Sequence, residues 1–333
     1  MRKLTALFAG LLMIGVLSGC GNQSEQVVLK FAYELPQSHP WGQGAERFKE
    51  IVEEKSDGEI QVQLYGGGQL GDSGREVQES VAIGTIEMGL SSTPLEQMNP
   101  YQEIFSLPYI FLNREHAWAS LDSEAGDMVG EHLLEYNLQH LAFWEDGFRQ
   151  VTNSVRPIEM PEDFEGLRIR VPESPVRMAT FSALGSNPLP MSFSEVFTAL
   201  QQGTVHGQEN PLPVIVNSSF YDVQPYLTLT NHVYSPASLF MNEDTWQNLS
   251  TEHQQIIQTA AEAGRDLNRD LNESDEIALV ERLESEGMEV FELEDVEAFQ
   301  EATQPVWEPV VEGLGEEGQE IIDIIEQLGG DYH

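Results

Sequence analysis

The sequence predicts an α/β protein of two domains, and three observations lead to this prediction. Short apolar segments typical of strands alternate along the chain with amphipathic segments typical of helices. Hydrophobic residues make up 40% of the chain, enough for a packed core despite a net charge of −40. The length of 333 residues exceeds what a single hydrophobic core usually serves. Alternation of this kind implies parallel sheets covered by helices.

The expected elements follow one another from residue 27 to residue 208. The first set contains 27–33 (strand), 41–56 (helix), 59–65 (strand), 75–83 (helix), 86–91 (strand), 115–136 (helix) and 138–144 (strand). The second set continues the pattern with segments at 167–171, 176–184, 193–201 and 205–208. The first helix has Ala45, Phe48, Ile51 and Val52 on one face, and Gly58 supplies its stop.

A much longer helix is predicted in the last third of the chain. Ser250 and Gln254 resemble a capping box, and apolar residues at helical spacing follow for about 30 residues. We expect this helix to break near Ser274. About 30 helical residues measure roughly 45 Å, more than the radius of either predicted domain, so the helix is expected to brace both.

The amino terminus has the order of a secretory signal peptide. Arg2 and Lys3 precede an apolar run at 4–17, and Leu-Ser-Gly-Cys occupies 17–20. The run is too short to span a bilayer comfortably, and no later stretch reaches about 18 apolar residues. We expect a signal peptide at 1–19, lipid on Cys20, the only cysteine, as in a bacterial lipobox, and a lipidated tether at 20–26. The alternative is an incidental thiol beside an ordinary cleavage site.

The charge of the chain narrows its possible partners. With 56 acidic residues against 16 lysines and arginines, the chain is not expected to bind nucleic acid, because phosphate binding needs cations. An anionic membrane surface is disfavoured for the same reason, so contact with the membrane is expected through the lipid anchor only. The acidic excess is either a solvated skin or an adaptation to a saline or alkaline habitat.

Motifs of enzymes and metal sites are weak or absent. The segment 66–71 satisfies G-x-G-x-x-G, but Asp72 places a carboxylate where phosphates would lie, so we interpret the segment as a glycine turn. The sequence has no G-x-S-x-G, H-E-x-x-H, C-x-x-C or P-loop pattern, and its eight histidines form no i, i+4 pair. No catalytic residue, cofactor or metal is therefore expected.

Positive charge is concentrated in one region. Removal of residues 1–19 would leave 14 cations, and five of them are arginines within 149–177. Five acids lie in the same window, so surface ion pairing is an alternative. In the predicted strand 167–171, the two arginines share the face opposite the apolar residues. Because a guanidinium can bind a carboxylate through two parallel hydrogen bonds, this strand indicates an anion site.

Several segments around this strand form a recognisable block. They are 166–172 (GLRIRVP), 183–185 (ALG), 190–196 (PMSFSEV), 199–203 (ALQQG) and 207–211 (GQENP), with further matches at 48, 69–71, 107–109, 147–150 and 230–232. Together they resemble the DctP-type substrate-binding proteins that serve TRAP transporters. The resemblance covers nearly the whole chain after the tether. It implies a two-lobed, periplasmic-binding-protein-like fold with the long helix bracing both lobes.

The resemblance also implies the lobe boundaries and the residues that bind an organic acid. Lobe I would comprise 27–146 and 236–276, and lobe II 147–235 and 277–333. The implied cleft residues are Arg170, for a bidentate salt bridge to a carboxylate, Arg149, for the same carboxylate or a second one, Asn210, for orientation, and Phe193, for an apolar wall.

Three further residues, Trp144, Glu34 and Ser92, fall near positions that line the other side of the cleft, with ordinary packing or surface as the alternative. A carboxylate at Glu34 would repel a second ligand carboxylate and accept hydrogen bonds from hydroxyls, which favours a sugar acid over a dicarboxylate. His206 departs from the aspartate of many relatives, but it lies outside these residues.

The sequence thus predicts an extracytoplasmic solute-binding lipoprotein at the outer face of the cell membrane, on the periplasmic side if an outer membrane is present. It would capture an organic acid anion, a C4-dicarboxylate or a sugar acid such as a uronate, and deliver it to a sodium-coupled TRAP permease without chemistry. The alternatives are an exported enzyme acting on acidic sugars and a sensory accessory binding protein. The acid bound, the oligomeric state and the number of host membranes stay open.

Overall fold

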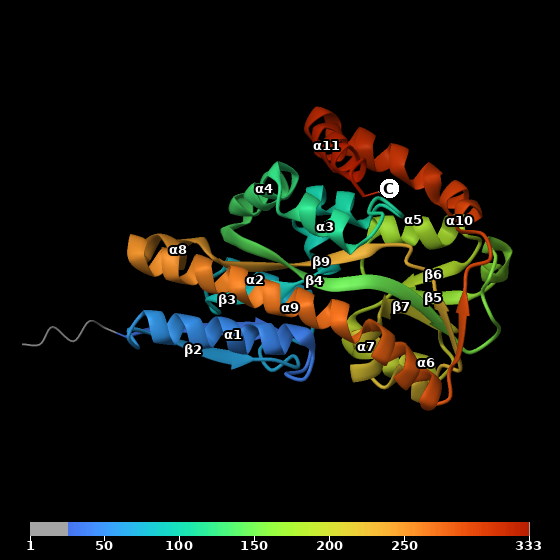
Figure 1. Cartoon of the computed structure of the whole chain (residues 1–333), viewed down its shortest axis with the longest axis horizontal. Helices are drawn as coiled ribbons and strands as arrows, with labels where there is room; N and C mark the ends of the chain where they lie inside the picture. Colours follow the sequence, from blue (N-terminus) through green and yellow to red (C-terminus); the bar gives the residue numbers. More distant parts are fainter. Residues whose placement is uncertain (1–25, 333) are drawn as a thin grey trace, which may run out of the picture.

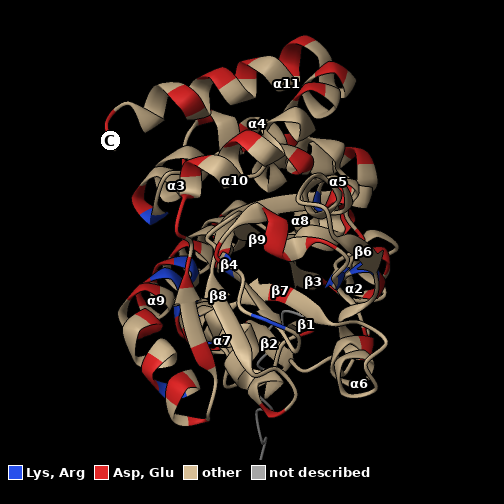
Figure 2. Ribbon diagram, turned by 90° about the vertical axis from the view of Figure 1, so that its right-hand side faces the viewer, with Lys and Arg blue, Asp and Glu red and all other residues tan. Residues whose placement is uncertain are grey.

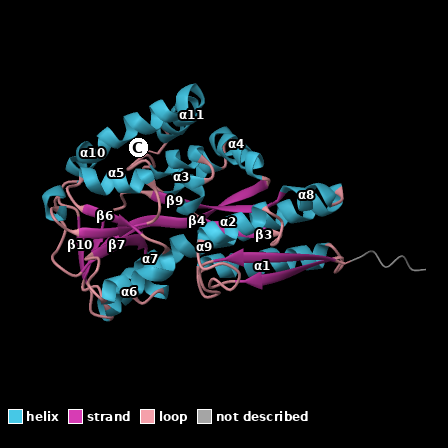
Figure 3. Cartoon of the chain, turned by 180° about the vertical axis from the view of Figure 1, so that it is seen from behind, coloured by secondary structure: helices cyan, strands magenta, loops and turns pink. Residues whose placement is uncertain are grey.

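The computed structural model describes residues 26–332, so the expected signal peptide and Cys20 lie outside the described residues. Strands and helices alternate in layers, with helices on both sides of the sheet (Figures 1 and 3). The strands are β1 (Val27–Tyr33), β2 (Ile60–Tyr65), β3 (Met88–Ser91), β4 (Leu138–Asn153), β5 (Arg168–Val171), β6 (Asn187–Pro190), β7 (Gly207–Pro211), β8 (Tyr226–Leu229), β9 (Tyr234–Asn242) and β10 (Glu289–Glu292).

The helices cover both faces of this sheet. They are α1 (Pro40–Lys55), α2 (Gly74–Ala82), α3 (Arg114–Leu121), α4 (Glu124–Glu131), α5 (Pro175–Ala183), α6 (Val196–Gln201), α7 (Leu212–Asn217), α8 (Glu243–Asn248), α9 (Thr251–Ser285), α10 (Val296–Thr303) and α11 (Trp307–Gly329). Short 3₁₀ turns include η1 (Thr93–Gln97), η2 (Pro100–Ser106), η3 (His132–Tyr136) and η5 (Phe193–Glu195). Within residues 26–332, none of the helices combines the length and apolarity that crossing a bilayer requires.

The sheet is mixed. Its strand order is β2-β1-β3-β9-β4-β7-β5-β6, with β8 beside β4 and β10 beside β8. On one side of the sheet, β1 pairs in parallel with both β2 and β3, and on the other side β5 pairs in parallel with both β6 and β7. At the centre, β9 and β4 are antiparallel to each other, β9 is antiparallel to β3, and β4 is antiparallel to β7. The expectation of purely parallel sheets is therefore wrong at the centre of the molecule.

The central strand β4 connects two lobes. Its first part, through Phe148, pairs with β9, and its last part, from Arg149, pairs with β7. One lobe is built around β1, β2 and β3 and the other around β5, β6 and β7, so the chain passes between the lobes through β4 and β9. The sequence predicted only 138–144 as a strand here, because the residues beyond are almost all buried and show no alternation.

The long helix is confirmed. Helix α9 extends over 35 residues and packs on α1 of one lobe and on α7 of the other (Figure 1). Ser250 is its N-cap and accepts a hydrogen bond from the backbone of His253 at 3.1 Å. The expected break near Ser274 is wrong, since the helix continues through this residue. One poor helix former costs only about 0.5 kcal/mol, which packing on both lobes offsets.

The expected single helix at 115–136 is also wrong, because the chain turns between α3 and α4. Asp122 ends α3 and forms ion pairs with Arg265 and Arg269 of α9 at 3.4 and 2.6 Å, and Ser123 then caps α4.

The remaining unpredicted elements lie mostly after residue 211. Strand β9, for example, is buried along its whole length and so lacks the period of two.

The carboxyl-terminal helix α11 packs on α3, α4 and η2, where apolar residues from all four segments form one core cluster. Acidic residues are spread over the outward surfaces of α9, α10 and α11, whereas basic residues are few (Figure 2). This distribution places most of the negative charge in contact with solvent.

Candidate functional site

A cavity of about 50 Å³ lies between the two lobes. Residues from β5, β7 and η5 line one side, and residues that follow β1 and β3 line the other. The cavity brings together six of the seven predicted ligand-binding residues, namely Arg170, Arg149, Asn210, Phe193, Glu34 and Ser92.

Arg170 is a buried cation whose charge no ion pair balances. It lies on β5, is 3% exposed, and donates from Nε and Nη2 to the carbonyl oxygen of Met191 at 3.0 and 2.6 Å. Within the described chain it forms no salt bridge, and its Nη1 makes no hydrogen bond. Burial lowers the pKa of Arg170 to about 10, so the side chain stays charged at neutral pH. The free edge of the guanidinium has the geometry to receive a carboxylate.

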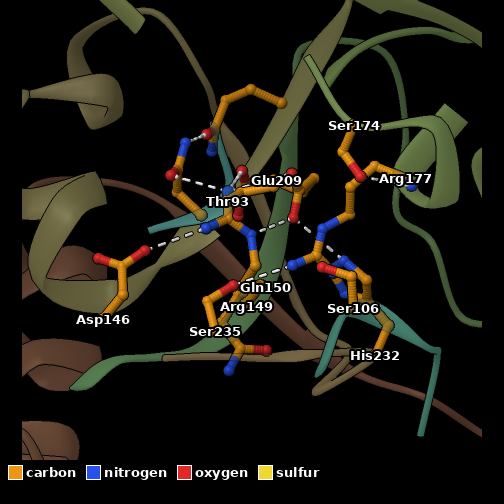
Figure 4. A network of polar contacts seen from close by, with 12 residues as sticks. Thr93, Ser106, Asp146, Arg149, Gln150, Ser174, Arg177, Glu209, His232 and Ser235 are labelled. Carbon is orange, nitrogen blue, oxygen red and sulfur yellow. Dashed lines mark hydrogen bonds and ion pairs between the residues drawn. The ribbon is translucent and has the colours of Figure 1, made fainter. Parts of the chain in front are cut away.

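Arg149 lies on β4 and is fully engaged with the protein. Its Nε pairs with Glu209, its Nη1 is 3.2 Å from Oδ2 of Asp146, and its Nη2 donates to the carbonyl oxygen of Glu209 at 2.7 Å and to Oδ1 of Asn210 at 2.9 Å (Figure 4). Burial alone would lower the pKa of Arg149, and the carboxylates of Glu209 and Asp146 raise it. Two acids thus balance this one cation.

Glu209 is the buried partner that holds Arg149 in place. Burial would raise the pKa of Glu209, but Arg149 and the hydrogen bond from His232 keep it well below the usual range. The Nε2 atom of His232 is 3.2 Å from Oε2 of Glu209. Asn210, the next residue on β7, donates to the side chain of Gln208, so its amide is fixed in orientation.

The opposite side of the cavity is acidic. Glu34 follows β1 and accepts a hydrogen bond from the backbone of Gly74, at the start of α2, at 3.1 Å. Burial, together with the nearby Asp146, raises the pKa of Glu34 to about 7. Asp146 accepts from the hydroxyl of Ser92 at 3.4 Å, and burial raises its pKa to about 6. A carboxyl group with such a pKa can form a hydrogen bond with a ligand hydroxyl, as an acceptor when it is ionised and as a donor when it is protonated.

The structure does not bring Trp144 to the cavity. The indole is completely buried, donates to the carbonyl oxygen of Ala261 at 3.1 Å and packs against Gly44 and Gly264, where α1 meets α9. The resemblance to DctP-type proteins predicts this residue near the other side of the cleft. The side chain of Trp144 instead faces α1 and α9, and the pairing of β4 with β9 is irregular between this residue and the cavity-lining Asp146.

Among the cavity residues that sequence reasoning did not name, two are large or charged and almost completely buried, Trp41 and Asp146. Trp41, at the start of α1, is 1% exposed and donates to the carbonyl oxygen of Glu145 at 2.9 Å. Asp146 also lines the cavity. The proximity of Asp146 to Arg149 was a usable signal, whereas Trp41 has the pattern of an ordinary core residue.

The glycine-rich segment forms a turn between β2 and α2. Gly67 and Gly68 have φ angles of 70° and 74°, a conformation that favours glycine. Neither residue lines the cavity between the lobes. Among residues 26–332, no three His, Cys, Asp or Glu side chains are arranged to hold a metal ion.

Comparison with known proteins agrees with this architecture. Residues 31–313 match the model of the family DctP, described as bacterial extracellular solute-binding protein, family 7. The 2,3-diketo-L-gulonate-binding periplasmic protein YiaO of Escherichia coli is 33% identical over 301 residues, which cover 90% of this chain and 92% of YiaO.

Two solved structures are also similar. A TRAP periplasmic solute-binding protein from Polaromonas sp. JS666, bound to D-erythronate, has a TM-score of 0.86 and 37% identity and covers 90% of this chain and 98% of its own. The sugar acid binding protein DctPAm of Advenella mimigardefordensis, in complex with galactonate, has a TM-score of 0.87 and 33% identity, with coverage of 91% and 99%. The chain therefore belongs to the DctP family, family 7 of the bacterial extracellular solute-binding proteins.

Proposed function

We propose that this chain is the solute receptor of a TRAP transporter, which captures an organic acid anion and delivers it to the membrane subunits of a sodium-coupled permease. One observation carries this proposal: Arg170 is a buried guanidinium that lines the cavity and has no acidic partner in the described part of the chain. A buried charge is costly without a counter-ion, and a ligand carboxylate would supply one. Relatives bound to D-erythronate and galactonate support the same class of ligand.

Capture would be coupled to closure of the lobes. A ligand whose carboxylate binds Arg170 on β5 can contact Glu34 and Ser92 of the other lobe only when the lobes are close together. The ligand would therefore stabilise the closed state by these additional contacts. No step of this cycle requires chemistry on the ligand.

The proposed location is the outer face of the cell membrane. The signal-peptide pattern of 1–19 and the Leu-Ser-Gly-Cys segment support lipid attachment at Cys20, with 20–26 as the tether. The lipid would keep the receptor near its permease. Fatty-acid labelling that disappears in Cys20→Ser tests the anchor, and labelling that persists in this variant would contradict it.

The proposed function is tested with a matched pair of variants on one strand. A thermal-shift screen of organic acids should find a ligand that stabilises the protein by about 2.7 kcal/mol at a hundredfold excess over its dissociation constant. Arg170→Lys should lower the affinity for this ligand, measured by calorimetry, by about tenfold or more, because an ammonium group cannot form the bidentate pair with a carboxylate.

Arg168→Lys is the control. The guanidinium of Arg168 donates to the carbonyl oxygens of Thr204 and Gly203, both at 2.8 Å, and does not line the cavity, so its replacement should leave the affinity unchanged. Equal affinities of Arg170→Lys and the unmodified protein would refute the role of Arg170. A screen in which only amino acids or neutral sugars respond would refute the ligand class.

A further inference from the structure

The segment that follows β5 in one lobe is contacted by side chains of the other lobe. Gln97, at the end of η1, donates from Nε2 to the carbonyl oxygen of Glu173 at 2.8 Å. Nη1 of Arg75 in α2 lies 3.9 Å from Oε2 of the same glutamate. The neighbouring Glu96 accepts from the hydroxyl group of Ser174. We call Arg75, Gln97 and Glu173 the interlobe contact, since these three residues join the lobes through polar interactions.

The interlobe contact lies at the margin of the cavity. Arg75 and Glu173 both line the cavity, yet their side chains are 53% and 42% exposed, so they stand between the cavity and solvent. Gln97 does not line it. Arg170, three residues before Glu173, is only 3% exposed. A ligand bound to this guanidinium therefore has to leave between segments that the interlobe contact holds together.

The two bonds of the interlobe contact differ in strength. The ion pair of Arg75 with Glu173 is long and exposed, and Nε of Arg75 also lies 3.2 Å from Glu79 of its own helix, so this pair is weak. The hydrogen bond from Gln97 is short and ends on the main chain, so it fixes the position of the backbone next to the cavity. Gln97 is therefore the stronger member.

We propose that Gln97 and Arg75 are positioning residues that slow ligand release: they hold Glu173 across the margin of the cavity and so retain an organic acid bound to Arg170. This inference rests on the proposed function, because it takes Arg170 as the anion site. Bonds between the lobes have to break before the ligand leaves, but they are not yet formed when it enters. They therefore lower the dissociation rate and leave the association rate nearly unchanged.

The test measures both rate constants on the full-length protein by stopped-flow fluorescence, with D-erythronate and galactonate as probes and Trp41 of the cavity as the reporter. Gln97→Ala should raise the dissociation rate about threefold or more and change the association rate less than about twofold. Gln254→Ala is the control. Its Nε2 also donates to a carbonyl oxygen at 2.8 Å, that of Trp246, but between the adjacent helices α9 and α8, so neither rate should change.

The charged member is tested with a matched pair of arginines. Arg75→Gln should raise the dissociation rate about twofold, whereas Arg47→Gln should not; Arg47 is 48% exposed and lies 3.3 Å from Glu50, so both variants remove one exposed cation. In a Glu173→Gln background, Arg75→Gln should have no further effect on this rate, because its partner is gone. An equal effect in both backgrounds would show that Arg75 acts directly on the ligand, which would overturn its assigned role.

Failure of this inference can be told apart from failure of the proposed function. If binding depended on Arg170 but Gln97→Ala left the dissociation rate unchanged, only the inference would be wrong. If Gln97→Ala lowered the association rate instead, the residue would shape the open site, and the inference would again be wrong. If neither acid bound to the unmodified protein, the proposed function and the inference would fall together. Thermal melting without ligand establishes that each variant folds.

Discussion

At the scale of single residues, the site depends on the different surroundings of two arginines. Arg149 and Arg170 are both 3% exposed and both line the cavity. Arg149 is held by Glu209 and Asp146, while Arg170 is held only by the carbonyl oxygen of Met191. The first arginine is a structural part of the wall, and the second has its charge available for a ligand.

The pair of Arg149 and Glu209 makes a prediction about stability. Glu209→Gln removes a carboxylate that is completely buried and leaves Arg149 with Asp146 as its remaining acidic partner. Loss of one member of a buried pair should reduce the free energy of unfolding by about 3 kcal/mol or more. Urea denaturation followed by circular dichroism measures the difference.

The control for this measurement is Glu50→Gln. The side chain of Glu50 is 65% exposed and forms a surface ion pair with Arg47 at 3.3 Å. Its replacement should change the free energy of unfolding by less than about 0.5 kcal/mol. Equal decreases in the free energy of unfolding of the two variants would show that the buried pair stabilises the protein no more than the surface pair does.

At the scale of elements, the crossing of α1 and α9 holds the long helix against the rest of the fold. Gly44 of α1 and Gly264 of α9 approach each other closely, and the indole of Trp144 packs beside both. A Cβ atom on Gly264 would lie 2.5 Å from the Trp144 ring and 2.9 Å from the carbonyl oxygen of Gly44. The absence of side chains at these two positions is what permits the crossing.

Gly264→Ala should therefore destabilise the protein although alanine favours helices. The overlap with Trp144 and Gly44 should cost about 1–3 kcal/mol, against about 1 kcal/mol gained in helix propensity. Gly313→Ala in α11 is the matched control, since nothing lies within 4 Å of the added methyl group there. Calorimetric melting should show a lower midpoint for Gly264→Ala and an equal or higher one for Gly313→Ala. A higher midpoint for Gly264→Ala would contradict the close crossing.

At the scale of the whole molecule, hydrogen bonds join the two lobes. Glu96 in η1 accepts from the hydroxyl groups of Ser106 and Ser174, and Ser174 caps α5 on the opposite lobe. The side chain of Gln97 donates to the carbonyl oxygen of Glu173 at 2.8 Å, and this hydrogen bond also joins the two lobes. Glu96 is 3% exposed, so its carboxyl group is shielded from water where the two lobes meet.

This burial predicts that the free energy of unfolding depends on pH. Burial raises the pKa of Glu96 from 4.5 to about 7, against the opposing effect of Arg177. The folded protein therefore binds a proton that the unfolded chain has released. The stabilising contribution is fully present below the ordinary pKa and is lost as the pH rises through about 7.

The measurement compares the unmodified protein with Glu96→Gln between pH 5 and pH 8. Glutamine keeps a similar shape but does not titrate, so the stability of the variant should fall less over this range, by up to about 3 kcal/mol. Chemical denaturation at each pH gives both curves. Parallel curves would show that Glu96 does not titrate in this range.

The sequence predicted much of the fold and of the site because several signals are local. The apolar pattern of Val27–Tyr33 gave β1 with its observed bounds, and the spacing after Ser250 gave α9. The alternation in 167–171 put Arg168 and Arg170 on one strand face, and the resemblance to DctP-type proteins selected Arg170. Trp144 was misplaced because its contacts with Gly44 and Gly264 come from distant parts of the chain.

The sequence by itself thus determined the α/β class, the bracing helix and the region rich in arginine, since period and composition act over a few neighbouring residues. Only the tertiary structure decided which of the arginines that line the cavity has no acidic partner in the described chain. Arg149 and Glu209 are 60 residues apart in the sequence and pair only when β4 lies beside β7. The same folding leaves Arg170 on the cavity wall without an acid in the described chain, because burial and pairing depend on the packing of the two lobes.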